Sequence, residues 1–176
     1  MTTAIGKPLL RKENFRLLTG RGAFSDDLNL PGQAFAVMVR SPHAHARIRS
    51  IAGDDARAAP GVLAVLTGAD FLADGLNAVT HLTSPNSPPD IRLENRDGSD
   101  IYNAPHFPLP ADRARFVGEA VAMVVAETLA AARDGAERGA VDYEERPAAP
   151  GTAAAEDGAP CAWPDAASNV SLDSGT

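Results

Sequence analysis

In this sequence, His43 and His45 are the residues whose types and spacing best suit a metal site. Two histidines at this spacing could supply two metal ligands from one strand or loop. The side chains that could complete such a site are His81, His106 and Cys161, and all three lie far away in the sequence. We therefore expect the pair to lie in a turn, where the rings form hydrogen bonds with backbone and water. No metal ligand is predicted in this chain.

Two other short motifs lack the context that their chemistry needs. The segment Gly20-Arg21-Gly22 begins like a dinucleotide-binding fingerprint, but Ser25 occupies the third glycine position and no clear strand precedes the segment. The sequence has no Gly-x-Ser-x-Gly motif, and no base can be placed beside Ser41. We therefore predict no catalytic residue and no cofactor-binding residue in this chain.

Glu119 is the only charged residue within the apolar segment 116–126. A carboxylate in such a segment must be desolvated, paired or placed at a strand edge, and desolvation would raise its pKa. Its expected partner is Arg113 or Arg115. Because no second acid or base lies close in the sequence, a structural or interface role is favoured over a catalytic one.

The single cysteine, Cys161, excludes an intramolecular disulfide, and it also excludes an iron–sulfur cluster or a four-cysteine zinc site supplied by this chain alone. Its acidic surroundings do not favour a reactive thiol. Together with the nearby Trp163 it is predicted to form a small docking or packing point.

The segments that would position these groups alternate between strand and helix patterns. Residues 34–40 are a nearly continuous apolar run, which predicts a strand buried on both faces. Residues 128–140 predict a helix with Thr128 as its N-cap, and Gly118 predicts a bulge in the strand before it. The other expected elements are strands at 46–51, 62–67, 116–126 and 141–144, one or two helical turns at 53–59 and a short turn at 68–71.

This order of elements predicts an α+β fold. We expect an N-terminal arm at 1–33, one domain at 34–147 and a C-terminal tail at 148–176. Within the domain, residues 74–112 are rich in proline and predict a long irregular loop.

Charge is distributed unevenly along the chain. The net charge of −7 argues against a nucleic-acid partner, because phosphate binding needs clustered Lys and Arg. The arm nevertheless carries a set of basic residues, which either is solvated or lies on an acidic partner surface: Lys7, Arg11, Lys12, Arg16 and Arg21. No segment approaches the length of a signal peptide's apolar region or of a membrane span, so a cytoplasmic location without membrane contact is expected.

Four stretches resemble the N-terminal α/β-hammerhead domain of the xanthine dehydrogenase/aldehyde oxidase family, the molybdenum hydroxylases. They are RKENFRLLTGRGAFSDDLNLPG (11–32), VRSPHAHARI (39–48), PGVLAVLTGAD (60–70) and RFVGEAVAMVVAET (115–128). The ending VDYEERPA (141–148) extends the resemblance. Ala120 stands where the family often has proline, and Arg146 where an apolar residue is usual.

The resemblance implies an α/β-hammerhead fold, with a mixed sheet and a few short helices. It also implies the large, molybdopterin-binding subunit of an oxidoreductase that hydroxylates an aldehyde, an N-heterocycle or a CO-like substrate. Molybdopterin, iron–sulfur clusters and FAD would belong to the complete enzyme, and none would be bound by this chain alone. The expected partners are the remaining molybdopterin-binding domains, toward which the tail would lead, and the iron–sulfur and FAD subunits.

Two other functions are compatible with a chain of this size. A free-standing binding or interaction module without catalytic activity remains an alternative, but a lipoyl or biotinyl carrier would need an exposed lysine on a hairpin tip. The only lysines are Lys7 and Lys12, both in the arm. A stand-alone enzyme would need a convergent set of reactive groups, and the sequence suggests none.

Overall fold

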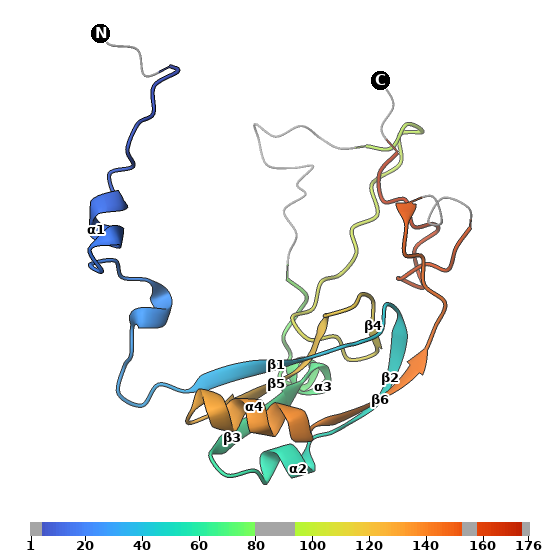
Figure 1. The fold of residues 1–176 in the computed structure, drawn as a ribbon. Coiled ribbons are helices and arrows are strands. Elements are labelled where there is room, and N and C mark those ends of the chain that lie inside the picture. Colours follow the sequence, from blue (N-terminus) through green and yellow to red (C-terminus); the bar gives the residue numbers. More distant parts are fainter. Residues whose placement is uncertain (1–4, 80–93, 153–157, 174–176) are drawn as a thin grey trace. The chain divides into compact units, whose positions relative to one another are not determined.

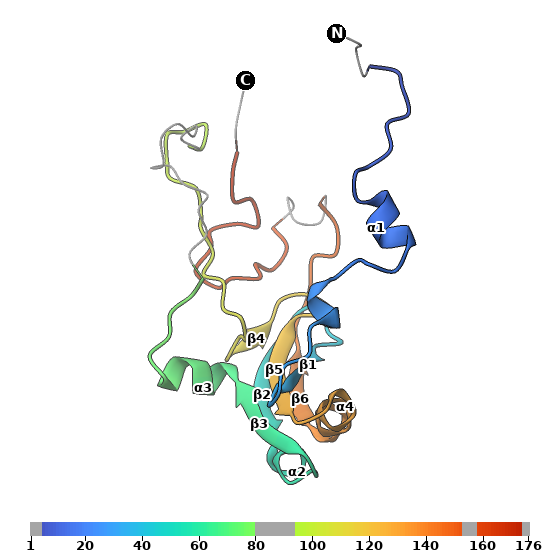
Figure 2. The same ribbon diagram turned by 90° about the vertical axis from the view of Figure 1, so that its left-hand side faces the viewer.

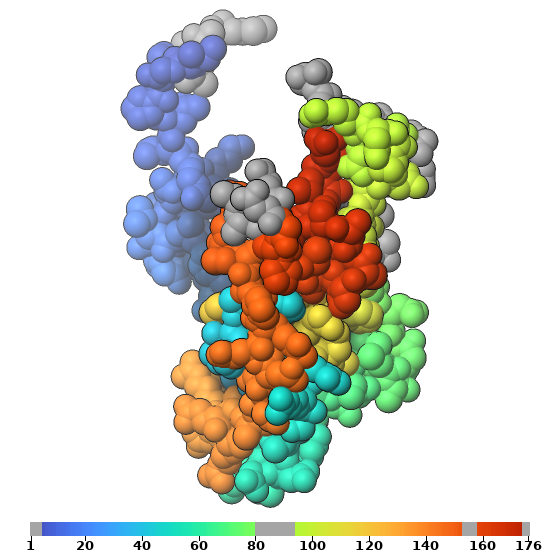
Figure 3. Space-filling view, turned by 90° about the vertical axis from the view of Figure 1, so that its right-hand side faces the viewer, coloured from blue at the N-terminus to red at the C-terminus, as the bar shows by residue number. Residues whose placement is uncertain are grey.

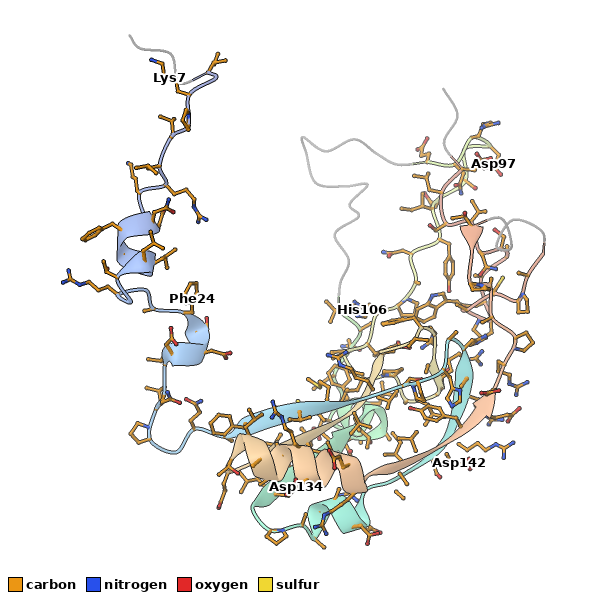
Figure 4. The ribbon with its side chains drawn as sticks, in the orientation of Figure 1. Lys7, Phe24, Asp97, His106, Asp134 and Asp142 are labelled. Atoms are coloured by element: carbon orange, nitrogen blue, oxygen red, sulfur yellow. The ribbon has the colours of Figure 1, made fainter. Side chains whose placement is uncertain are left out.

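The computed structural model describes residues 5–79, 94–152 and 158–173, and the chain divides into two compact units, 1–33 and 34–176 (Figure 1). The first unit contains the short helix α1 (Asn14–Leu18) and the 3-10 turn η1 (Ser25–Asp27). None of its described residues is buried. Lys7 and Phe24 mark this unit in Figure 4.

The second unit contains two three-stranded sheets in which every pairing is antiparallel. The first sheet has the order β1-β5-β3, formed by β1 (Phe35–Arg40), β5 (Ala120–Ala126) and β3 (Val62–Thr67). The second has the order β4-β2-β6, formed by β4 (Arg113–Ala114), β2 (Ala46–Ala52) and β6 (Ala140–Glu145). The α+β class is confirmed, with two antiparallel sheets in place of the mixed sheet that the resemblance implied.

Helix α4 (Leu129–Arg138) packs on β1 and β5, beside the shorter α2 (Asp54–Arg57) (Figures 1 and 2). Its inner face is made of small residues, with Ala132 and Gly135 buried, so the helix can approach the sheet closely. The fully buried Val121 and Val124 of β5 belong to two apolar clusters, and Val39 packs against both.

Several elements confirm the pattern-based predictions. Strand β3 has the predicted bounds, and β2 is half-exposed as its alternation indicated. The Thr128 Oγ1 accepts a hydrogen bond from the Ala131 N–H at 3.1 Å, so the predicted N-cap of α4 is present. The described parts of the 74–112 loop contain isolated β-bridges and no longer strand. Residues 80–93 of this loop lie outside the described residues.

Three predictions are corrected by the structure. Strand β1 is half-buried on one face only, because alternate residues from Ala36 to Arg40 are exposed. Strand β5 begins at Ala120 rather than Phe116, because Gly118 adopts φ +89° and the chain turns there. The expected turn at 68–71 is the helix α3 (Gly68–Ala73), whose N-terminus is closed by reciprocal hydrogen bonds between Thr67 and Asp70.

Candidate docking site at Arg115

Arg115 directly follows the short strand β4, and its side chain is only 10% exposed. Its guanidinium carbon lies 3.7 Å from the centre of the Trp163 ring. The same guanidinium donates to the Asp112 carboxylate at 3.1 Å and to the Arg113 carbonyl at 3.1 Å. A planar cation stacked on an indole ring is attracted by the ring's electrons, most strongly where water is excluded. Arg115 therefore joins the end of the 74–112 loop to the C-terminal tail.

Further polar contacts hold the tail against the same loop. The Tyr102 hydroxyl donates to the Asp165 carboxylate at 2.8 Å, and the Arg96 N–H donates to the Asp173 carbonyl at 2.8 Å. The tail (orange to red) accordingly lies against the segment after residue 94 (yellow-green) in Figure 3, and Asp97 marks the outer end of this loop in Figure 4. The contacts span more than sixty residues of sequence, so the tail is a docked segment.

Glu119 is half-buried, and its carboxylate accepts a hydrogen bond from the Arg115 backbone N–H. Burial raises its pKa above the ordinary value of 4.5, although this hydrogen bond and the attraction of Arg115 act in the opposite direction. The expected partner Arg115 thus contacts this carboxylate through its backbone N–H, whereas its guanidinium binds Asp112. The alternative partner Arg113 instead donates to Asp112 at 3.0 Å.

Asp112 has the opposite balance of effects. Burial alone would raise its pKa, but the attraction of Arg115 and hydrogen bonds from Arg113 and Arg115 together hold the pKa below its usual range. Two carboxylates therefore flank Arg115. The attraction of Arg115 favours the ionised form of Asp112, whereas burial disfavours the ionised form of Glu119. Each of these charged groups is used in an internal contact of the domain.

A pocket of about 330 Å³ lies beside this cluster. Aromatic side chains form much of its wall, namely Phe107, Phe116 and Trp163, with His106, Arg115 and Glu119 as its polar members. Cys161 is a free, partly buried thiol near this wall, and the stacking of Trp163 agrees with the packing role expected for this segment.

The two histidines contact other residues, and each has its own partner. His43 Nδ1 lies 2.9 Å from the Glu145 carboxylate, while its ring meets Tyr143 edge-on. His45 is buried, with Nδ1 2.9 Å from the Pro147 carbonyl oxygen. Within the residues that the structure describes, no group of three His, Cys, Asp or Glu side chains could hold a metal ion. The candidate ligand His81 lies outside those residues.

The sequence did not predict that Arg115 and Trp163 meet. It offered two separate signals, a docking point at Trp163 and an arginine near Glu119, but they are separated by dozens of residues. Only the antiparallel pairing of β2 with β4 and β6 brings the two segments to one end of the sheet.

The helices in the described part of the chain include none with the length and apolar character of a membrane span.

Comparison with known proteins places this arrangement in a family. A family model described as "Aldehyde oxidase and xanthine dehydrogenase, a/b hammerhead domain" matches residues 19–147. The large subunit of nicotine 6-hydroxylase from Paenarthrobacter nicotinovorans is 40% identical over 130 residues, which make up 74% of this chain and 14% of that subunit. The large chain of carbon monoxide dehydrogenase from Afipia carboxidovorans is 37% identical over 137 residues, which make up 78% of this chain and 15% of the relative.

A solved structure gives the same result. The structure of quinoline 2-oxidoreductase from Pseudomonas putida 86 matches with a TM-score of 0.73 and 39% identity, over 97% of this chain and 20% of that chain. The chain thus spans a fifth or less of the length of these three relatives. It belongs to the aldehyde oxidase and xanthine dehydrogenase family and contains the α/β hammerhead domain of that family.

Proposed function

We propose that this chain is the N-terminal structural portion of the molybdenum-binding large subunit of a molybdenum hydroxylase. In this role it supplies packing surface and subunit contacts, and the reaction takes place elsewhere in the complete enzyme. The observation that carries the proposal is the Arg115 cluster, in which the charged groups Asp112, Arg115 and Glu119 are all used to hold loop, turn and tail together. Such an arrangement orders a scaffold.

The complete enzyme would carry out oxidative hydroxylation, with molybdopterin, iron–sulfur clusters and FAD as its cofactors. Support comes from relatives whose names describe a nicotine 6-hydroxylase, carbon monoxide dehydrogenases and a xanthine dehydrogenase molybdenum-binding subunit. The residues described here do not fit these cofactors. Cys161 alone cannot ligate an iron–sulfur cluster, and the described side chains form no metal-binding group. No chemical step is therefore assigned to this chain.

In this proposal the three segments of the chain have separate tasks. The arm at 1–33 and the tail at 148–176 make contacts with the rest of the enzyme, and the hammerhead at 34–147 supports them. The expected partners are the remaining molybdopterin-binding domains and the iron–sulfur and FAD subunits. Relatives described as the large or gamma subunit of an enzyme complex support the expectation of further subunits.

The proposal is tested by measuring metal and flavin on two preparations of this chain. The 176-residue chain is purified alone, and a tagged copy is purified with its associated proteins from the source cells. We expect molybdenum, iron and flavin in the second preparation only. Stoichiometric molybdenum on the isolated chain would contradict the proposal. A tagged chain that carries no molybdenum polypeptide would support a free-standing interaction module instead.

A further inference from the structure

The link between β4 and β5 presents two adjacent apolar side chains to solvent. Phe116 is 58% exposed and Val117 is 64% exposed, although both follow the largely buried Arg115. Exposed apolar residues that are scattered singly are ordinary on protein surfaces. Two large ones side by side on a turn form a small apolar projection, which we call the 116–117 knob.

The backbone that carries the knob is fixed from several directions. The Gly118 N–H donates to the Ser41 carbonyl at 2.7 Å, and the Ser41 N–H donates to the Glu119 carbonyl at 2.9 Å. The Arg40 guanidinium donates to the Gly118 carbonyl at 2.7 Å. These bonds tie the turn to the end of β1, more than seventy residues earlier in the chain.

Glu119 fixes the other end of the same turn. Its N–H donates to the Phe116 carbonyl at 3.2 Å, and its carboxylate accepts from the Arg115 backbone N–H. Gly118 has φ +89°, a conformation that favours glycine, so the sequence itself is fitted to this turn. A half-buried carboxylate thus stabilises a turn whose two largest side chains remain outside the core of the domain.

A shallow concavity of about 210 Å³ lies beside the knob and continues its apolar surface. Apart from His45, Arg115 and Asn169, its wall consists of apolar residues: Ala44, Phe116, Val117, Ala148, Ala149, Pro150, Pro160 and Ala162. Most of these belong to the C-terminal tail. The side chains are small and conformationally restricted, so burying them costs little entropy. Knob and concavity together form one apolar surface with few polar groups to desolvate.

We propose that the 116–117 knob and this concavity form a preorganised docking surface for the remaining part of the molybdenum-binding large subunit. This inference rests on the function proposed above. Two observations indicate this partner. The matched region makes up only 14% to 20% of the length of these relatives, and residues of the C-terminal tail form much of the wall of the concavity. The covering surface is an apolar recess that receives Phe116, because interface hot spots pair apolar anchors with such pockets.

The test places a photo-cross-linking benzoylphenylalanine at position 116 or 117 of the full chain in its source cells. A matched control carries the same group at position 63, because Leu63 in β3 is 57% exposed. After irradiation, the attached peptides are identified by mass spectrometry. We expect positions 116 and 117 to capture peptides of the molybdenum-binding polypeptide outside residues 1–176, on the same or a separate chain. Adducts within these residues, with a second copy or with other subunits, or no more adduct than at position 63, would overturn the inference.

A second measurement separates this inference from the proposed function. Phe116→Ser is expected to lower the molybdenum recovered with the tagged chain about tenfold, because truncation of an interface anchor commonly has such an effect. Its melting temperature should stay close to that of the wild type, and Leu63→Ser should leave the recovery unchanged. If the unaltered chain recovers no molybdenum, the proposed function has failed. If it does and Phe116→Ser recovers as much, only the docking surface is wrong.

Discussion

Glu119 shows how one residue can report on the whole candidate site. It was recognisable in the sequence because it is the only charge in an apolar segment, and the raised pKa follows from the burial that such a segment implies. Its partner Arg115 was also predictable, since the two lie four residues apart. The stacking of Arg115 on Trp163 was not, because a pairing across dozens of residues depends on strand order, which no single-sequence pattern specifies.

The raised pKa of Glu119 predicts how the variant Glu119→Gln depends on pH. From the ordinary value of 4.5 up to the raised pKa, the folded protein binds more protons than the unfolded chain. The free energy of unfolding therefore falls as the pH rises through this window. Glutamine does not titrate and can still accept the Arg115 N–H, so Glu119→Gln should gain stability relative to wild type as the pH is raised from 4.5.

Urea unfolding at a series of pH values measures this effect, with Trp163 as the fluorescent probe because it is the only tryptophan. The exposed Glu137 of α4 offers the control Glu137→Gln, whose stability should run parallel to that of the wild type across the same pH range. A Glu119→Gln variant that runs parallel as well, or that loses stability with rising pH, would show that burial does not control this carboxylate.

At the scale of elements, the predictions succeeded where the signal is local. Strand β3 and the cap of α4 follow from alternation and from a threonine oxygen placed before a helix. The helix α3 was missed although its signal was present, because Thr67 and Asp70 have the spacing of a capping box. The one-sided burial of β1 could not be predicted, since it depends on which elements pack on each face of the sheet.

Helix α3 also provides a prediction about packing, through its first residue Gly68. A Cβ atom at this position would lie 2.6 Å from both the Ala111 nitrogen and the Leu109 carbonyl oxygen. Alanine is about 1 kcal/mol better than glycine inside a helix, but a backbone clash of this kind costs more. Gly68→Ala should therefore lower the free energy of unfolding by roughly 2–4 kcal/mol.

Gly139→Ala is the matched control for this substitution. The nearest atom to its added Cβ would be the Ala136 carbonyl oxygen at 3.6 Å, an ordinary contact, so the change should stay within about 0.5 kcal/mol. Urea unfolding of both variants makes the comparison. If Gly68→Ala is as stable as Gly139→Ala, the backbone of residues 109–111 can move away from α3 without cost, and the close packing around Gly68 is not needed for the fold.

In the proposed function, the motifs that identify the family and the chemistry of the enzyme lie in different parts of the large subunit. The resemblance depended on motifs that build the hammerhead, among them the stretch 115–128 with its turn and strand, and these motifs carry contacts between segments. The identity of the family was therefore readable from a chain that spans 20% or less of its relatives. The substrate was not, because the motifs that carry the resemblance are shared by a nicotine 6-hydroxylase and a carbon monoxide dehydrogenase.

The division into two units predicts which end of the chain the hammerhead needs. Among the described residues, every buried apolar residue of the core lies between Ala46 and Ala132, within the second unit, and none in the first unit is buried. Deleting residues 1–33 should therefore shift the melting temperature of the remainder by less than about 3 °C.

Deleting residues 148–176 instead removes Trp163 and its contact with Arg115, and should lower the free energy of unfolding by roughly 1–3 kcal/mol. Circular dichroism at 222 nm during heating compares the two truncations, and an N-terminal deletion that melts earlier than the C-terminal one would mean that the first unit completes the hammerhead core.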